Sequence, residues 1–316
     1  MRTRALKITA LAAAAALMLA ACGNGDDADD STSPANGSGN GGQNGASPDA
    51  QIFDVSGIEV DESLAALLPE GFGDTLTIGT NFPYAPMQML AADGVTPIGF
   101  DMDMARAIGA VLGLQVDIQA ADFSAIIPSV EGGLFDLGIS AFTVTAVRME
   151  TVTMISYFNA GSLLAVQAGN PAGVDPDNLC GLTVGAQANT IQHERLLDLN
   201  DAGAPCADDT VDVRPFDSAA LAVSSLEGGI VDAVWADAPV TYYAVHLSEG
   251  SLETLGQTTY SAPMGIVVAQ DATGLADAVQ GALVQLIDLG YLGQIADSWG
   301  IAAGLVDGPE INPTLS

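Results

Sequence analysis

Arg148 is the residue whose type and position most clearly point to chemistry. The chain has seven Lys and Arg against 39 Asp and Glu. Three of the seven lie in residues 1–7, and the others are Arg106, Arg148, Arg195 and Arg214. Arg148 follows the strand-like segment 136–140 and a Thr-x-Thr turn, where a planar guanidinium can hold a carboxylate through two hydrogen bonds. This pattern predicts a site for an anionic group on a small ligand.

Asp237 is the acidic counterpart, because it follows the second of two similar strand ends. Residues 131–138 (EGGLFDLG) recur as 227–234 (EGGIVDAV), each a helix end, a Gly-Gly turn and a buried strand. The repeat indicates two similar α/β lobes, in which ligands bind beyond the carboxyl ends of the strands. Arg148 in one lobe and Asp237 in the other would complement a zwitterion. Arg148 in a structural ion pair and Asp237 as a helix N-cap before Pro239 are the simpler alternatives.

Length and charge limit the classes of protein to consider. A chain of 316 residues can bury one large core or two smaller ones. Its net charge of −32 at pH 7 would repel nucleic acid and anionic lipid headgroups. We therefore expect no nucleic-acid partner.

The N-terminus predicts an export signal followed by a lipid anchor. Residues 1–7 are basic, and residues 8–20 are apolar but too short for a membrane span. They lead into LAACG, which is similar to the bacterial lipobox, so we predict a signal peptide over 1–21 and lipidation at Cys22. An ordinary signal peptide with an incidental cysteine is the alternative. Residues 22–50, rich in Gly, Asn and Ser, predict a flexible linker that holds the protein at the outer face of the cytoplasmic membrane.

Cys180 and Cys206 remain after the predicted signal peptide and lipid site. In an exported chain, two further cysteines are suited to one disulfide, here closing a loop of about 25 residues. A metal site is the weaker alternative, because neither His193 nor His246 has a metal-ligand spacing to them.

Strand-like and helix-like segments alternate from Thr75 onward. The expected strands are 76–79, 116–118, 137–139, 183–186, 211–213 and 231–235. The expected helices include 100–111, 126–130, 196–199 and 221–226, with Asp101 as N-cap of the first. This alternation predicts an α/β fold of parallel sheets with helices on both faces.

Six segments, taken in order, resemble one family. They are 79–87 (GTNFPYAPM), 99–105 (GFDMDMA), 122–128 (DFSAIIP), 135–148 ending in T-x-T-x-x-R, 232–237 (DAVWAD) and 286–291 (LIDLGY) before Trp299. From about residue 76 to 300 the chain resembles the solute-binding proteins of bacterial ABC importers, family 3, which bind polar amino acids. The resemblance implies the periplasmic-binding-protein type II fold, with two α/β lobes joined by two crossover strands. Lobe 1 would comprise 75–160 and 264–316, and lobe 2 residues 161–261, with crossings near 158–163 and 260–265.

The resemblance also implies a ligand pocket between the lobes. Arg148 would hold the ligand α-carboxylate with help from Thr143, while the Ala141 carbonyl and the Asp237 carboxylate would bind the ammonium. Further predicted pocket residues are Asn81, Tyr84, Phe123, Gln187 and Thr190, of which Tyr84 and Phe123 would flank the ligand side chain. An amide at Asn81 favours a neutral polar or acidic side chain over a cationic one. The 187–190 loop departs from the family's Gln-x-Gly-Thr, because Asn189 replaces the glycine.

The implied function is capture of a polar amino acid by lobe closure and delivery to the permease subunits of an ABC importer. It implies a monomer that is not an enzyme and uses no cofactor or metal. Two alternatives stay open. Some relatives of this fold are dehydratases of prephenate or arogenate, although no phosphate loop or His-Glu-x-x-His motif supports catalysis here. The other alternative is a sensor that signals to a separate receptor.

Overall fold

The computed structural model describes residues 52–315, so the predicted signal peptide, Cys22 and the whole predicted linker lie outside the described residues. The helices are α1 (Glu62–Ala65), α2 (Phe100–Leu112), α3 (Phe123–Glu131), α4 (Ala146–Met149), α5 (Ile191–Asp198), α6 (Ala219–Glu227), α7 (Ala238–Leu247), α8 (Thr273–Asp288), α9 (Tyr291–Ser298) and the 3₁₀ helix η1 (Ala302–Gly304). The strands are β1 (Thr75–Thr80), β2 (Met89–Leu90), β3 (Pro97–Ile98), β4 (Gln115–Ala120), β5 (Leu137–Gly138), β6 (Val152–Gln167), β7 (Thr183–Gln187), β8 (Asp212–Phe216), β9 (Ala233–Asp237) and β10 (Leu252–Ala269).

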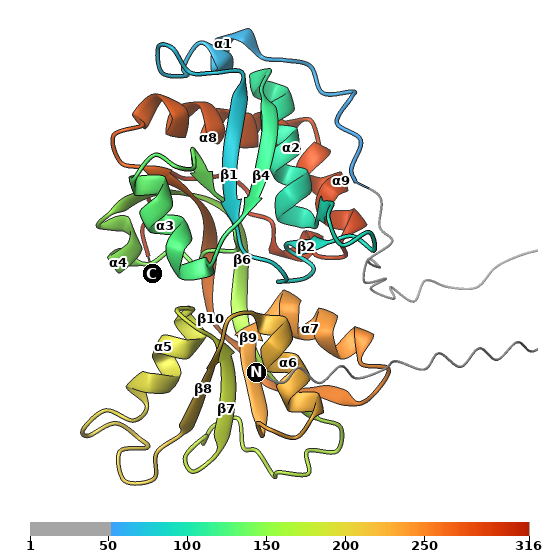
Figure 1. Cartoon of the computed structure of the whole chain (residues 1–316), viewed down its shortest axis with the longest axis vertical. Coiled ribbons are helices and arrows are strands. Elements are labelled where there is room, and N and C mark those ends of the chain that lie inside the picture. Colours follow the sequence, from blue (N-terminus) through green and yellow to red (C-terminus); the bar gives the residue numbers. More distant parts are fainter. Residues whose placement is uncertain (1–51, 316) are drawn as a thin grey trace, which may run out of the picture. The chain divides into compact units, whose positions relative to one another are not determined.

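Two groups of parallel strands share two long antiparallel strands. The order is β4-β1-β5-β10-β6-β9-β7-β8 (Figure 1). Within the first group β1 pairs in parallel with β4 and β5, and within the second β7 pairs in parallel with β8 and β9. Helices connect the parallel strands, as the alternating sequence pattern predicts.

The predicted crossings fall inside β6 and β10, which pair along most of their lengths. Their pairing shifts register between Leu255 and Thr259, and again before Ala262, so the ladder is irregular where the two strand groups meet. Gly161 of β6 allows the close approach, because a Cβ there would lie 2.7 Å from the Thr259 carbonyl oxygen. The lobe boundaries proposed from sequence remain a prediction.

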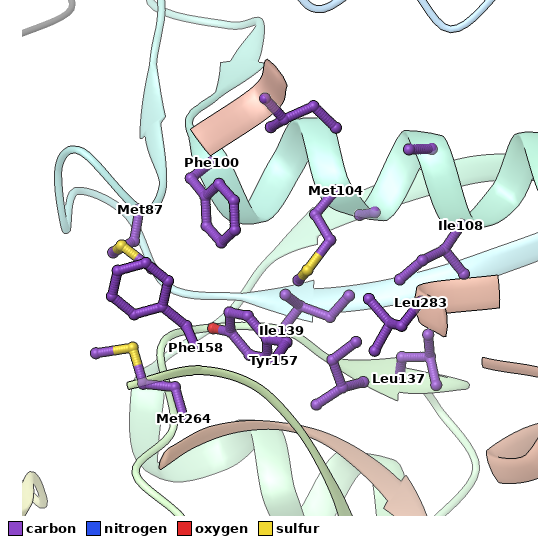
Figure 2. Close-up of a cluster of buried hydrophobic side chains, with 14 of the residues drawn as sticks. Met87, Phe100, Met104, Ile108, Leu137, Ile139, Tyr157, Phe158, Met264 and Leu283 are labelled. Atoms are coloured by element: carbon purple, nitrogen blue, oxygen red, sulfur yellow. The ribbon is translucent and has the colours of Figure 1, made fainter. Parts of the chain in front are cut away.

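The first strand group is backed by a large apolar core (Figure 2). Side chains from α2, α8 and the strands meet there, among them Met104, Ile108, Leu137, Ile139, Tyr157 and Leu283. Leu164, Val184, Leu196 and Trp235 belong to a separate buried cluster beside the second group. Each group of parallel strands therefore has its own apolar support. No helix within residues 52–315 has the length and apolar character needed to cross a membrane.

The repeat read from the sequence has matching hydrogen bonds in the two groups. Asp136 Oδ2 accepts from the Thr77 backbone N–H at 2.7 Å, and Asp232 Oδ2 accepts from the Thr183 backbone N–H at 2.8 Å. The second glycine of each Gly-Gly turn has a positive φ, 73° and 67° respectively. Each Asp thus holds the start of one strand, β5 or β9, against the neighbouring strand, β1 or β7.

Cys180 and Cys206 form the predicted disulfide. It joins the chain just before β7 to the loop that follows α5, with 26 residues of sequence separation. The bridge therefore ties the two segments that flank the 187–190 loop.

Replacing both cysteines with serine is expected to lower the free energy of unfolding by about 3 kcal/mol, because a loop of this length loses closure entropy in the unfolded chain. Urea unfolding of the exported, oxidised protein measures the effect. Reductant should destabilise the wild type and leave the double variant unchanged; equal midpoints for wild type and variant would contradict the expectation.

Candidate functional site

A pocket lies where the carboxyl ends of the parallel strands meet. It is lined by Tyr84, Gln88, Phe123, Ser140, Ala141, Thr143, Arg148, Gln187, Thr190, Ile191, Gln192 and Asp237. The empty space among these side chains is about 280 Å³, which includes space open to solvent.

Arg148 reaches this pocket from α4, a short helix capped by Thr145, whose hydroxyl accepts from the Arg148 backbone N–H at 3.2 Å. Arg148 Nη1 donates to the Thr143 carbonyl oxygen at 2.7 Å, and Nη2 donates to the Asn189 carbonyl oxygen at 3.3 Å. Two of its five N–H donors are thereby used.

No carboxylate within residues 52–315 forms an ion pair with Arg148; the pairs found there are Arg106–Asp103 and Arg214–Asp212. The alternative of a structural ion pair therefore finds no support. Burial lowers the pKa of the Arg148 guanidinium, although an arginine stays charged at any physiological pH.

Two aromatic rings lie beside this guanidinium. Phe123 stacks on Phe142 with ring centroids 4.7 Å apart. The Arg148 guanidinium carbon lies 5.7 Å from the Phe123 centroid and 5.5 Å from that of Phe142. Cation–π attraction and the two carbonyl contacts hold the charge in place before any ligand arrives.

Asp237 ends β9 and occupies the N-cap position of α7, but its side chain makes no capping hydrogen bond. Instead, Oδ2 accepts from the Tyr84 hydroxyl at 2.6 Å and Oδ1 accepts from Gln192 Nε2 at 2.8 Å. Burial raises the pKa of the Asp237 carboxyl to about 6. The two hydrogen bonds and the charge of Arg148 lower this pKa, but burial has the larger effect. Asp237 is therefore the N-cap residue of α7 by its backbone position, as the alternative predicts, but its carboxylate does not cap the helix.

The expectation that Asp101 caps α2 is wrong. The helix begins after Gly99, and the Asp101 carboxylate is fully buried. Asp101 Oδ2 accepts from the Ala141 backbone N–H at 3.0 Å, and Oδ1 accepts from the Tyr157 hydroxyl at 2.9 Å. Burial raises the pKa of Asp101 to about 7. The contact holds Ala141 at φ 50°, a left-handed conformation that costs free energy for a residue with a Cβ.

The altered 187–190 loop keeps a sharp turn. Asn189 adopts φ 62°, as its tolerance of left-handed angles predicts. The Thr190 hydroxyl caps α5 by accepting from the His193 backbone N–H, and donates to the Gln187 carbonyl oxygen at 2.7 Å. Gln187 Nε2 donates to Asn81 Oδ1 at 2.8 Å.

The structure brings all the predicted pocket residues to this region, with one difference in placement. Asn81 does not line the pocket but holds Gln187 from behind, while its Nδ2 donates to the Ala121 carbonyl oxygen. Sequence reasoning missed Gln88, Ser140, Ile191 and Gln192. Gln192 could have been found from the sequence, because it lies in the first turn of the helix that begins after Thr190, a predicted pocket residue. No group of three or more potential metal ligands occurs within the described range.

Residues 76–302 match the family described as bacterial extracellular solute-binding proteins, family 3. The chain belongs to this family. Arginine-binding protein ArgT of Corynebacterium glutamicum is 35% identical over 254 residues, which cover 79% of this chain and 82% of ArgT. The family assignment and the sheet topology together confirm the predicted type II fold.

Solved structures agree with this solute-binding fold. An ancestral arginine-binding protein bound to arginine is 29% identical with a TM-score of 0.67, covering 72% of this chain and 98% of that chain. An ancestral amino acid-binding protein, described as a precursor of cyclohexadienyl dehydratase, is 25% identical with a TM-score of 0.65, covering 72% and 95%. Both of these proteins are named for amino-acid binding, and the second links the fold to an enzyme lineage.

Proposed function

We propose that this solute-binding protein captures an α-amino acid between its lobes and delivers it to the permease of an ABC importer. The proposal is carried by one observation: Arg148 and Asp237 line the same small pocket and do not pair with each other. The ligand carboxylate would bind the free N–H groups of Arg148, and the ligand ammonium would bind Asp237. Relatives named for arginine support an amino-acid ligand.

Lobe closure is the step that would bring both charges to one ligand. Tyr84 and Arg148 belong to the proposed lobe 1, and Asn189 and Asp237 to the proposed lobe 2. The hydrogen bonds from Tyr84 to Asp237 and from Arg148 to Asn189 join the two groups. A ligand held by both lobes favours the closed state because it gains the second set of contacts only there.

We further propose that the protein is exported and anchored to the membrane. Membership of an extracellular family supports an exported protein, and lipidation at Cys22 with the 22–50 linker would keep a monomer close to its permease. A permease and an ATPase encoded beside this gene, together with loss of amino-acid uptake on its deletion, would distinguish transport from sensing.

Calorimetric titration with L-amino acids tests the binding function. At least one should bind, while its methyl ester, which lacks the carboxylate charge, and its N-acetyl derivative, which lacks the ammonium, should each bind about 100-fold more weakly. Binding that tolerated either modification would remove the roles given to Arg148 and Asp237, and failure of every amino acid to bind would remove the function.

We also propose that the protein is not an enzyme. The dehydratase alternative has a direct assay, because incubation with prephenate or arogenate would release phenylpyruvate or phenylalanine. Product formation that depended on Asp237 would replace binding with catalysis.

A further inference from the structure

Gln88 carries a buried acceptor that the protein leaves unpaired. The residue is 1% exposed and lines the pocket that holds Arg148 and Asp237. Its Nε2 donates to Ser140 Oγ at 3.1 Å, whereas Oε1 has no hydrogen-bond partner among residues 52–315. A buried amide oxygen without a donor is costly, so a ligand N–H group that reached it would gain a hydrogen bond at little cost in desolvation.

The groups around this acceptor are held in place and neutral. The Ser140 hydroxyl oxygen that anchors Gln88 also accepts from the Asn81 backbone N–H at 3.1 Å. Asn81 in turn receives Gln187 Nε2, so these amides and the hydroxyl form one connected network beside the pocket. A network of this kind has little freedom to reorient and provides donors and acceptors without a formal charge.

A zwitterionic ligand would balance both charges of the pocket. Arg148 and Asp237 are the charged residues among those lining it. Asp101 is not a second acid of the site, since it does not line the pocket. Glu194 is exposed on α5 and also does not line the pocket. A cationic ligand side chain would therefore be buried without a counter-charge.

We propose that the bound amino acid has an uncharged side chain with N–H donors, such as a carboxamide or a urea, and that Gln88 Oε1 receives one of them. The inference rests on the proposed amino-acid function and specifies its substrate class. It separates this chain from its relatives named for arginine, because arginine offers similar N–H donors but adds a charge.

Two matched ligand pairs test the charge directly. L-citrulline and L-arginine have similar length and donors and differ in charge, and L-glutamine and L-glutamate differ in the same way with the opposite sign. In calorimetric titrations at pH 7.5, the neutral member of each pair should bind at least about tenfold more tightly, which corresponds to 1.4 kcal/mol. Arginine binding as tightly as citrulline would overturn the inference but leave the proposed function standing; no binding by any amino acid would overturn the function.

Substitutions at Gln88 test the residue. Q88E supplies the missing counter-charge in the same shape and should shift the arginine-to-citrulline affinity ratio toward arginine by about tenfold or more. Q88M removes the acceptor and should weaken glutamine binding by about tenfold. Gln294→Glu, on the exposed part of α9, adds the same charge outside the pocket and should leave the ratio unchanged. An unchanged ratio in Q88E, with near-ultraviolet circular dichroism like that of the wild type, would remove Gln88 from the specificity site.

Discussion

Arg148→Ala is expected to weaken amino-acid binding by about 3 kcal/mol, which is on the order of 100-fold in Kd. The guanidinium is held by the Thr143 and Asn189 carbonyls, so its remaining N–H groups are positioned for a carboxylate. Removing it would leave the ligand carboxylate buried without a partner, and that penalty is larger than the loss of one exposed contact. Calorimetric titration of the best ligand measures the difference.

Arg214→Ala is the matched control. Arg214 pairs with Asp212 at 2.6 Å on the surface of β8, and its side chain is 56% exposed. Because an exposed pair contributes little, this variant should bind like the wild type. Arg148→Lys should fall between the two, since it keeps the charge but loses the planar fork. Wild-type affinity in Arg148→Ala would exclude the carboxylate contact, whereas equal losses in Arg148→Ala and Arg214→Ala would indicate a general electrostatic effect.

The fold could be predicted from the sequence because its signals are local. Each Gly-Gly turn carries the positive φ that only glycine adopts freely, and the Asp that follows reaches a neighbouring strand. The repeat of this short pattern was enough to indicate two similar strand groups. The positions of the two crossings came from the family resemblance and not from a local signal, and the lobe boundaries stay a prediction.

The long-range contacts in and around the site could not be derived from local sequence patterns. Asp101 lies in the first turn of α2, where a cap is the local expectation, yet its carboxylate bonds to Ala141, 40 residues away. Tyr84 and Asp237 meet across 153 residues. Gln88 looks like an ordinary polar residue next to a short strand, and its unpaired oxygen becomes evident only once Ser140 is packed against it. Such contacts depend on how distant strand ends meet, which residue spacing does not encode.

Amino-acid affinity is expected to fall as pH drops below about 6. Burial raises the pKa of Asp237 to about 6, and an ammonium ligand needs the ionised form. Between pH 7.5 and pH 5 the affinity should therefore fall by about tenfold, because one proton must be displaced from Asp237. The ligand ammonium stays protonated on acidification and so does not cause this loss. Asp237→Asn should bind weakly at both pH values and show a flat profile; a slope that survived in it would belong to another group, such as Asp101, whose pKa burial raises to about 7.

The Asp237 carboxyl should make the folded protein more stable on acidification, whereas it makes ligand binding weaker. This difference in direction separates an effect in the pocket from acid unfolding. Its folded pKa of about 6 lies above the ordinary value of 3.8, so the folded state binds more protons than the unfolded state between these values. The stabilisation from Asp237 is then complete below pH 3.8 and is lost as pH rises through about 6, an effect on the order of 3 kcal/mol. On acidification, the free energy of unfolding of the wild type should thus rise relative to that of Asp237→Asn. The ligand affinity of the wild type should fall over the same pH range. If both stability and affinity declined on acidification relative to Asp237→Asn, the carboxyl would be ionised and paired in the folded state, and the account of a buried group awaiting an ammonium would be wrong.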